Sequence, residues 1–245
     1  MKIDRTKNAG RNIVFGCMLK IYQIVMPFIM RTLMIYYMGI QYLGLNSLFT
    51  SILQVLNLAE LGVGSAMVYS MYKPIAVDDK KMICALMKLY RTYYRVIGII
   101  IAFLGLCLVP FIPKLIKSDV PADINIYVLY ILNLSVTVLS YWLFAYKNCL
   151  LDAHQRTDVA SKVTLVTNTL QYIVQFFTLC ILKNYYAYII VSLAAQALTN
   201  ILTAVVATRM YPDYRPDGNL SKEVISGINR RIRDLFTSKL GVVIV

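Results

Sequence analysis

Acidic residues and catalytic signatures are both scarce in this 245-residue chain. It holds 12 Asp and Glu against 25 Lys and Arg, with a single histidine. No phosphate-binding loop, HExxH helix, GxSxG turn or DxD pair occurs, although ATP-driven pumps and many hydrolases or transferases need such motifs. The five cysteines include no CxxC pair, so they predict neither a disulfide framework nor a metal site. We therefore expect no enzymatic activity, with no catalytic residue, no metal and no cofactor.

Long apolar runs dominate what is present. Hydrophobic residues make up 59% of the chain and charged residues 15%, which is more apolar side chain than a soluble core buries. Windows of about 20 residues give six candidate membrane spans. They are 14–38, 45–69, 96–112, 126–146, 163–182 and 186–208. The sequence predicts an all-α membrane protein built around a six-helix transmembrane bundle, in contact with membrane lipids.

Basic residues are divided unevenly between alternate loops. Twenty of them lie before the first span, within 73–95, within 147–162 or after residue 208, and only Lys114, Lys117 and Lys183 lie in the other loops. By the positive-inside rule, the N-terminus and the segment after residue 208 are cytoplasmic. The net charge of +13 is explained by loops that meet anionic headgroups, so we expect no nucleic-acid partner.

The two remaining cations, Lys20 and Arg31, lie inside the first apolar run. On a helix, Lys20, Gln23 and Arg31 fall within about 80° of one another, so their polar atoms share one face. A charge at membrane depth costs about 2.5 to 3.5 kcal/mol, so this stripe predicts a polar cavity in which these residues bind substrate. Lys20 has an alternative role as an anchor, because it lies close enough to the cytoplasmic end to snorkel to the interface.

Polar side chains also align along every other span except the third. The substrate-binding residues that these stripes predict are Gln54, Asn57, Asn168, Gln175, Gln196 and Asn200. Hydrogen bonding between helices explains any single stripe equally well. Five stripes together with two cations and one acid favour a shared cavity, because hydrogen bonding between helices needs no net charge.

The acid among the spans is Glu60, and two roles are open for it. It either neutralises Arg31 or Lys20 as a buried pair, or it is a protonatable group that couples transport to an ion gradient. We assign it to ion coupling as the hypothesis to test. Close by, Gly62 and Ala66 are four residues apart, a spacing that favours close packing of helices.

The chain turns polar after residue 209. Residues 210–239 predict a cytoplasmic linker with an amphipathic helix on the inner leaflet, since Ile225, Ile228 and Ile232 recur at helical spacing opposite three arginines. The predicted organisation is a six-helix lobe at 1–209, this linker, and the truncated start of a seventh span at 240–245. The only histidine, His154, lies in a cytoplasmic loop, where we expect it to be solvated.

The stretch 27–73 resembles the opening of bacterial polysaccharide-unit flippases (Wzx type), which belong to the multidrug/oligosaccharidyl-lipid/polysaccharide exporter superfamily. The matching elements are Arg31, the G-x-x-Y-L-G-L turn at 39–45 and the L-x-x-L-G-x-G-S-A pattern at 58–66. The resemblance implies the N-terminal lobe of a two-lobe exporter in the bacterial cytoplasmic membrane. It further implies that an undecaprenyl-type lipid-linked oligosaccharide crosses by alternating access, with Arg31 facing its pyrophosphate or acidic sugars.

Family members have two six-helix lobes, whereas this sequence contains one. We therefore expect either a fragment or a chain that pairs with a second six-helix lobe. Two rival functions remain open: a drug or cation exporter of the same superfamily, which would favour acids over Arg31 and Lys20 in its cavity, and a non-transporting membrane accessory subunit. The second rival predicts that removing the charges within the spans leaves the assembled system active.

Overall fold

The computed structural model describes residues 5–60, 62–116 and 120–244, and every regular element in these ranges is helical. Four helices are long and apolar enough to cross a membrane, at Asn8–Tyr37, Lys80–Leu115, Thr157–Leu182 and Tyr185–Met210. A bent pair makes a fifth span if its two helices act as one. The expectation of an all-helical protein with several apolar spans is confirmed, while the expected bundle of six spans is not.

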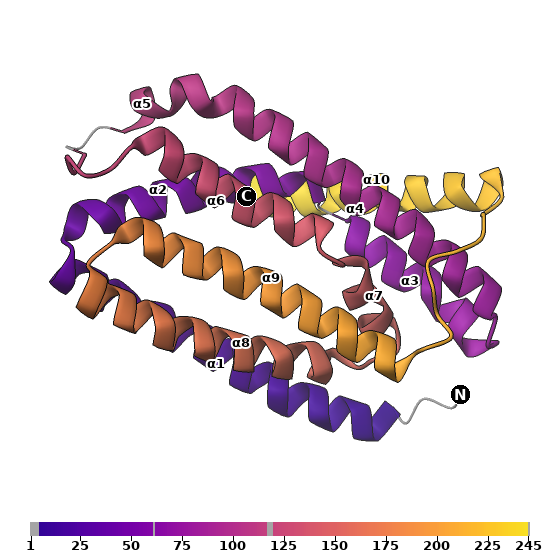
Figure 1. Ribbon diagram of the computed structural model, residues 1–245. Helices are drawn as coiled ribbons and strands as arrows, with labels where there is room; N and C mark the ends of the chain where they lie inside the picture. The colour runs from indigo at the N-terminus through magenta and orange to yellow at the C-terminus, as the bar shows by residue number, and fades with distance from the viewer. Residues whose placement is uncertain (1–4, 61, 117–119, 245) are drawn as a thin grey trace.

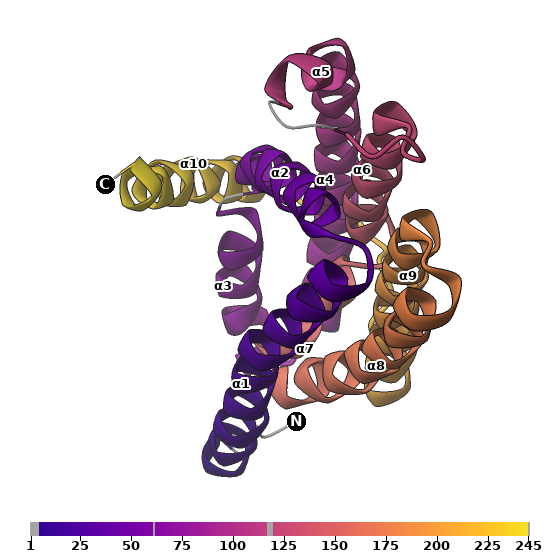
Figure 2. The same cartoon turned by 90° about the vertical axis from the view of Figure 1, so that its left-hand side faces the viewer.

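The helices run roughly alongside one another, with their connections gathered at the two ends of the bundle (Figure 1). Their bounds are α1 Arg5–Tyr37, α2 Ile40–Leu56, α3 Val63–Ala76, α4 Lys80–Leu108, α5 Ile112–Leu115, α6 Ile126–Trp142, α7 Tyr146–Ala153, α8 Thr157–Phe177, α9 Tyr185–Met210 and α10 Lys222–Ile244. Neighbours pack in the order α1, α8, α9, α6, α4, α3 and α10, and the short α7 contacts α3, α4, α8 and α9. Seen along the bundle, this order forms an arc with α1 at one edge (Figure 2).

The predicted second span, 45–69, is two helices and not one. α2 ends at Leu56, a 3-10 turn covers Asn57–Glu60, and α3 begins at Val63. Gly62 precedes α3 with φ +90°, in the left-handed region that favours glycine. A Cβ at Gly62 would lie 3.0 Å from the backbone of both Ile232 and Phe236 in α10. The close packing predicted for Gly62 is therefore confirmed, with α10 as the neighbour.

The predicted fourth span also changes direction. α6 and α7 are bent by 50° relative to one another. Phe144, in the connection between them, has φ 59°, which is uncommon for a bulky side chain. The bend carries α7 across the bundle, so that Asn148, Cys149 and Asp152 border the interior of the protein.

α10 differs from the helix expected to lie on the inner leaflet. Its apolar residue Ile228 is buried, and Val224 and Ile232 pack against the protein core. Arg231 donates to Ser70 Oγ of α3 at 3.2 Å. The apolar face of α10 is therefore covered by protein, because α3 offers the complementary surface that the sequence pattern alone assigned to lipid.

The expectation of a solvated His154 is wrong. The side chain is buried, its Nδ1 lies 2.8 Å from the Leu150 carbonyl oxygen, and its ring centroid lies 4.3 Å from that of Tyr211 and 5.6 Å from that of Tyr214. The segment after α9 folds back over the loop and covers the histidine. Burial lowers the pKa of His154 below its ordinary value of 6.5.

Candidate functional site

A polar cavity of about 810 Å³ lies between the Asn57–Glu60 turn with α3, the first half of α4, the α6–α7 bend and the middle of α9. Its charged, amide and hydroxyl groups come from Glu60, Ser65, Ser140, Asn148, Asp152, Thr157, Gln196 and Asn200. Five tyrosines complete the wall, namely Tyr69, Tyr72, Tyr90, Tyr94 and Tyr141. Among the residues that the structure describes, no lysine or arginine lines the cavity. Its volume falls in the range of small-molecule sites, about 300 to 1,000 Å³.

Glu60 is held by tyrosines at the break between α2 and α3. The Tyr94 hydroxyl donates to Glu60 Oε1, and the Tyr90 hydroxyl donates to Tyr94 at 2.8 Å. The Tyr141 hydroxyl donates to Asn57 Oδ1 at 3.0 Å, and the rings of Tyr94 and Tyr141 stack with centroids 5.8 Å apart. The break in the helix thus places both predicted residues, Asn57 and Glu60, against the tyrosines of α4 and α6.

The neighbours of the Glu60 carboxylate bear on whether it forms a buried ion pair, the first of its two possible roles. In the described part of the chain, no Lys or Arg lies within ion-pair distance of its carboxylate. Arg31 and Lys20 lie elsewhere, on α1. Glu60 is therefore not half of a buried pair with either cation in this conformation.

Two amides on α9 join the cavity wall to α6. Gln196 Nε2 donates to Asn200 Oδ1 at 3.2 Å, and Asn200 Nδ2 donates to the Ser140 carbonyl oxygen at 3.1 Å. Both residues line the cavity, as their predicted role requires. The bond from Asn200 to Ser140 also joins α9 to α6, so this stripe combines a place on the cavity wall with hydrogen bonding between helices.

The predicted residues of α8 lie outside the cavity. Gln175 is 1% exposed and donates to Ser192 Oγ at 2.7 Å and to the Tyr188 carbonyl oxygen at 3.2 Å. Asn168 is half-buried on the same helix. For Gln175, the structure favours hydrogen bonding between helices over ligand binding, because its amide is enclosed between α8 and α9.

Lys20, Gln23 and Arg31 are exposed on α1, and Gln54 is exposed on α2. α1 is attached to α8 through Tyr22, whose hydroxyl donates to Thr169 Oγ1 at 2.9 Å. Lys20 and Arg31 lie about 160° to 180° around the helix from Tyr22, on the side that α8 leaves free. Only 6% of the most apolar stretch of α1 is buried. The single site predicted from sequence is therefore divided into a polar cavity within the bundle and an open polar face on α1 and α2.

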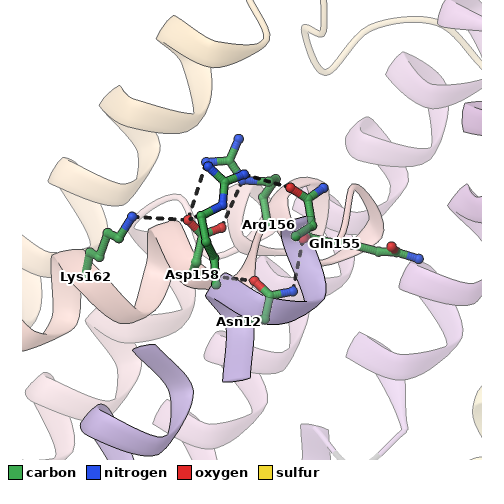
Figure 3. A network of polar contacts seen from close by, with 7 residues as sticks. Asn12, Gln155, Arg156, Asp158 and Lys162 are labelled. Carbon is green, nitrogen blue, oxygen red and sulfur yellow. Dashed lines mark hydrogen bonds and ion pairs between the residues drawn. The ribbon is translucent and has the colours of Figure 1, made fainter. Parts of the chain in front are cut away.

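A second polar network, shown in Figure 3, joins α1 to the start of α8 and to the residues just before it. The carboxylate of Asp158 is completely buried, with Arg156 Nε at 2.9 Å, Lys162 Nζ at 3.3 Å and Arg11 Nε at 4.0 Å. A buried carboxylate is tolerated when it is paired and hydrogen-bonded. Its place in the first turn of α8 adds a favourable interaction with the helix dipole.

Asn12 completes this network from α1. Its Oδ1 accepts the backbone N–H of Asp158 at 2.9 Å, and its Nδ2 donates to the Gln155 carbonyl oxygen at 3.0 Å. Sequence reasoning missed the network, although an acid placed two residues after Arg156 and four before Lys162 was a usable signal. The network is structural, since its acid is enclosed by its own partners.

Sequence reasoning also missed Asp152 and the tyrosines that surround the cavity. The spacing of Tyr90 and Tyr94 at i and i+4 on one helix was a signal for a shared face. Among the described residues, no group of three His, Cys, Asp or Glu could hold a metal ion. Comparison of the chain with protein-family models, with curated proteins and with solved structures finds no match.

Proposed function

We propose that this chain is one six-helix lobe of a membrane transporter that moves a lipid-linked oligosaccharide across the bacterial cytoplasmic membrane during surface polysaccharide synthesis. The observation that carries the proposal is the exposure of Lys20, Gln23 and Arg31 on a membrane-length helix that the rest of the chain barely covers. The substrate that fits such a face has an anionic headgroup and an apolar tail.

The energetic argument concerns Arg31 first. A guanidinium facing hydrocarbon costs about 2.5 to 3.5 kcal/mol, whereas one that meets a diphosphate makes paired, charge-assisted hydrogen bonds. Lys20 fits the same headgroup less strongly, because its longer stem also reaches the interface.

The broken helices support a transporter over a passive anchor. Substrate and ion sites of many transporters are formed where membrane helices are discontinuous. Here the interruption between α2 and α3 carries Glu60, and the bend between α6 and α7 borders the same cavity. In this proposal Glu60 is the protonatable group that couples substrate movement to an ion gradient.

A second six-helix lobe is the partner that the proposal requires. It would cover the exposed face of α1 and α2, where Arg31 and Gln54 lie, and the two lobes would enclose the path of the headgroup. The undecaprenyl-type tail would stay in the surrounding lipid. The N-terminus is cytoplasmic in this arrangement, as the basic loops predict.

Complementation tests the proposal. A strain that lacks its surface-glycan flippase receives the gene together with its second lobe, and surface glycan is measured for the wild type, Arg31→Ala and Arg31→Lys. We expect at least about tenfold less glycan for Arg31→Ala, with partial recovery for Arg31→Lys, because a lost charge-assisted contact to a diphosphate has this magnitude. The matched control is Arg209→Ala, an exposed arginine in the last turn of α9.

Equal glycan in the wild type and in Arg31→Ala would overturn the role of the open face. That result is also what a non-transporting accessory subunit predicts. The Arg31→Lys variant separates charge from geometry, since lysine keeps the charge but loses the planar fork.

Export of organic cations is the second candidate function. The observation that favours it is the pair of carboxylates, Glu60 and Asp152, in a tyrosine-rich cavity lined by no Lys or Arg in the described chain. Cells expressing this exporter would extrude a cationic dye, and Asp152→Asn would abolish extrusion while Arg31→Ala would not. The opposite ranking of the two variants supports the lipid-linked substrate.

A further inference from the structure

We propose that the polar cavity binds a sugar unit that carries a protonated amino group. Its lining combines three features that such a ligand needs: two carboxylates, aromatic faces, and amide or hydroxyl groups. The inference rests on the proposed function for the identity of the larger substrate, of which this sugar would be one unit. The site itself is argued from the cavity alone.

The charge of the lining selects the sign of the ligand. Glu60 and Asp152 are both half-buried, and no lysine or arginine of the described chain lines the same space. A carboxylate that is partly removed from water and has no cation beside it is unfavourable. An ammonium group that enters the cavity would supply the ion pair that the protein itself does not form. An acidic sugar would meet two like charges and be repelled.

The aromatic wall already accepts a cation. The guanidinium of Arg231 lies 4.2 Å from the ring centroid of Tyr69, one of the tyrosines that line the cavity. Tyr72 is 47% exposed, and its ring centroid lies 6.3 Å from that of Tyr69. A second cation at the Tyr72 face would have the same favourable interaction with an aromatic quadrupole.

The neutral polar groups specify a hydroxylated ligand over a purely apolar cation. Asn148, Gln196 and Ser140 line the cavity beside the tyrosines, and each can donate and accept hydrogen bonds. Sugars present apolar faces edged by hydroxyl groups, which match an aromatic ring beside amides. The volume of about 810 Å³ is also larger than an inorganic ion needs.

Binding to the purified chain in lipid nanodiscs tests the inference without any transport step. Glucosamine, N-acetylglucosamine and glucuronate are titrated by calorimetry at neutral pH, with sodium chloride and tetraphenylphosphonium as further probes. We expect saturable binding of glucosamine that is at least about tenfold tighter than that of N-acetylglucosamine, because acetylation removes the charge. Glucuronate and sodium are expected not to compete.

Two sets of variants locate the site. Asp152→Asn should weaken glucosamine binding by about tenfold, while the exposed control Glu223→Gln leaves it unchanged. Should Asp152→Asn fail to fold, the pair Tyr72→Phe and Tyr72→Leu replaces it, because Tyr72 is largely exposed and its loss does not open the core. Phenylalanine should retain binding and leucine should lose it.

Each other outcome overturns the inference. Equal binding of glucosamine and N-acetylglucosamine would show that the amine is not recognised. Competition by sodium would indicate an inorganic cation site, and tighter binding of tetraphenylphosphonium would indicate an organic-cation site. No saturable binding would remove the site altogether. Since complementation does not require an amino sugar and nanodisc binding does not require transport, the inference and the proposed function can fail separately.

Discussion

The backbone N–H of Asp158 donates a hydrogen bond to Asn12 Oδ1 at 2.9 Å and thereby joins α8 to α1 across 146 residues of sequence. Asp158 is the most completely buried charged residue in the described chain. Three cations lie beside its carboxylate. This junction fixes one end of α1, whose exposed face carries Arg31. The position of the open polar face therefore depends on a network that makes no contact with it.

Removing the Asp158 carboxylate should destabilise the protein. We expect Asp158→Ala to lower the free energy of unfolding by about 1 to 3 kcal/mol, less than for a fully buried pair because its cationic partners stay partly exposed. Thermal unfolding in detergent measures the change. Asp234→Ala, which removes one partner of an exposed pair with Arg233, should change stability by less than about 0.5 kcal/mol. Equal melting temperatures for both variants would contradict the structural role of Asp158.

Substitution of Gly62 should loosen α10. An alanine there would adopt an unfavourable φ of +90° and bring its Cβ to 3.0 Å from the α10 backbone. We expect Gly62→Ala to destabilise the protein by about 1 to 3 kcal/mol and to increase hydrogen exchange in 222–239. Gly16→Ala is the control, because nothing lies within 4 Å of a Cβ at that helical position. Unchanged exchange in both variants would show that α10 does not depend on Gly62.

Acidification should destabilise the fold through His154. Because burial lowers its pKa below 6.5, the unfolded state binds more protons as the pH falls through this value. The contribution of neutral His154 is complete above about pH 6.5 and is lost as the pH falls toward the lower pKa of the folded state. We expect the melting temperature to fall less between pH 7.5 and 5.5 in His154→Phe than in the wild type.

A surface group provides the internal comparison for that experiment. The hydrogen bond from Lys80 lowers the pKa of Asp213 below 3.8, so Asp213 stays ionised over the whole interval. Asp213→Asn should therefore leave the pH dependence between pH 7.5 and 5.5 unchanged. A smaller pH dependence in this variant than in the wild type would contradict the assignment to His154.

Glu60 should control the response of transport to the ion gradient. In proteoliposomes that contain the complete transporter, Glu60→Gln should remove the dependence of substrate movement on an imposed proton gradient, because a glutamine carries no exchangeable charge. Tyr94→Phe keeps the carboxylate and loses only one hydrogen bond to it, so the dependence on the gradient should persist. Gradient-dependent movement in Glu60→Gln would contradict the coupling role.

Helical periodicity predicted a polar face on five of the six expected spans, but it did not predict which helix each face would contact. Asn57, Glu60, Gln196 and Asn200 could be selected because polar residues recur along their helices. Gln175 has the same pattern, yet it is enclosed against Ser192 and the backbone of Tyr188. Sequence spacing fixes only the angle at which a side chain projects from its own helix. It therefore cannot distinguish a residue on a cavity wall from a residue in a contact between two helices.

Two interruptions of helices explain why the structure has fewer continuous apolar spans than the six that hydropathy predicted. Runs 45–69 and 126–146 are continuous in hydropathy, and an apolar window does not register a local turn. Gly62 and Phe144 adopt positive φ at these places, and packing of α10 and α7 against their neighbours accompanies both. The positive φ of Gly62 could be suspected because glycine readily adopts the left-handed region. Nothing about a phenylalanine predicts such a conformation at position 144.

The sequence by itself determined that this protein is helical and rich in apolar spans, because a chain with such long apolar runs can satisfy its backbone hydrogen bonds in lipid only within helices or closed barrels, and the runs are long enough for helices. Only the tertiary structure decided that Glu60 lies against Tyr94, that Asp152 joins the same cavity and that Lys20 and Arg31 remain on an open face. The physical reason is that helix formation is local, whereas the pairing of faces depends on bends and on packing between residues far apart in the chain.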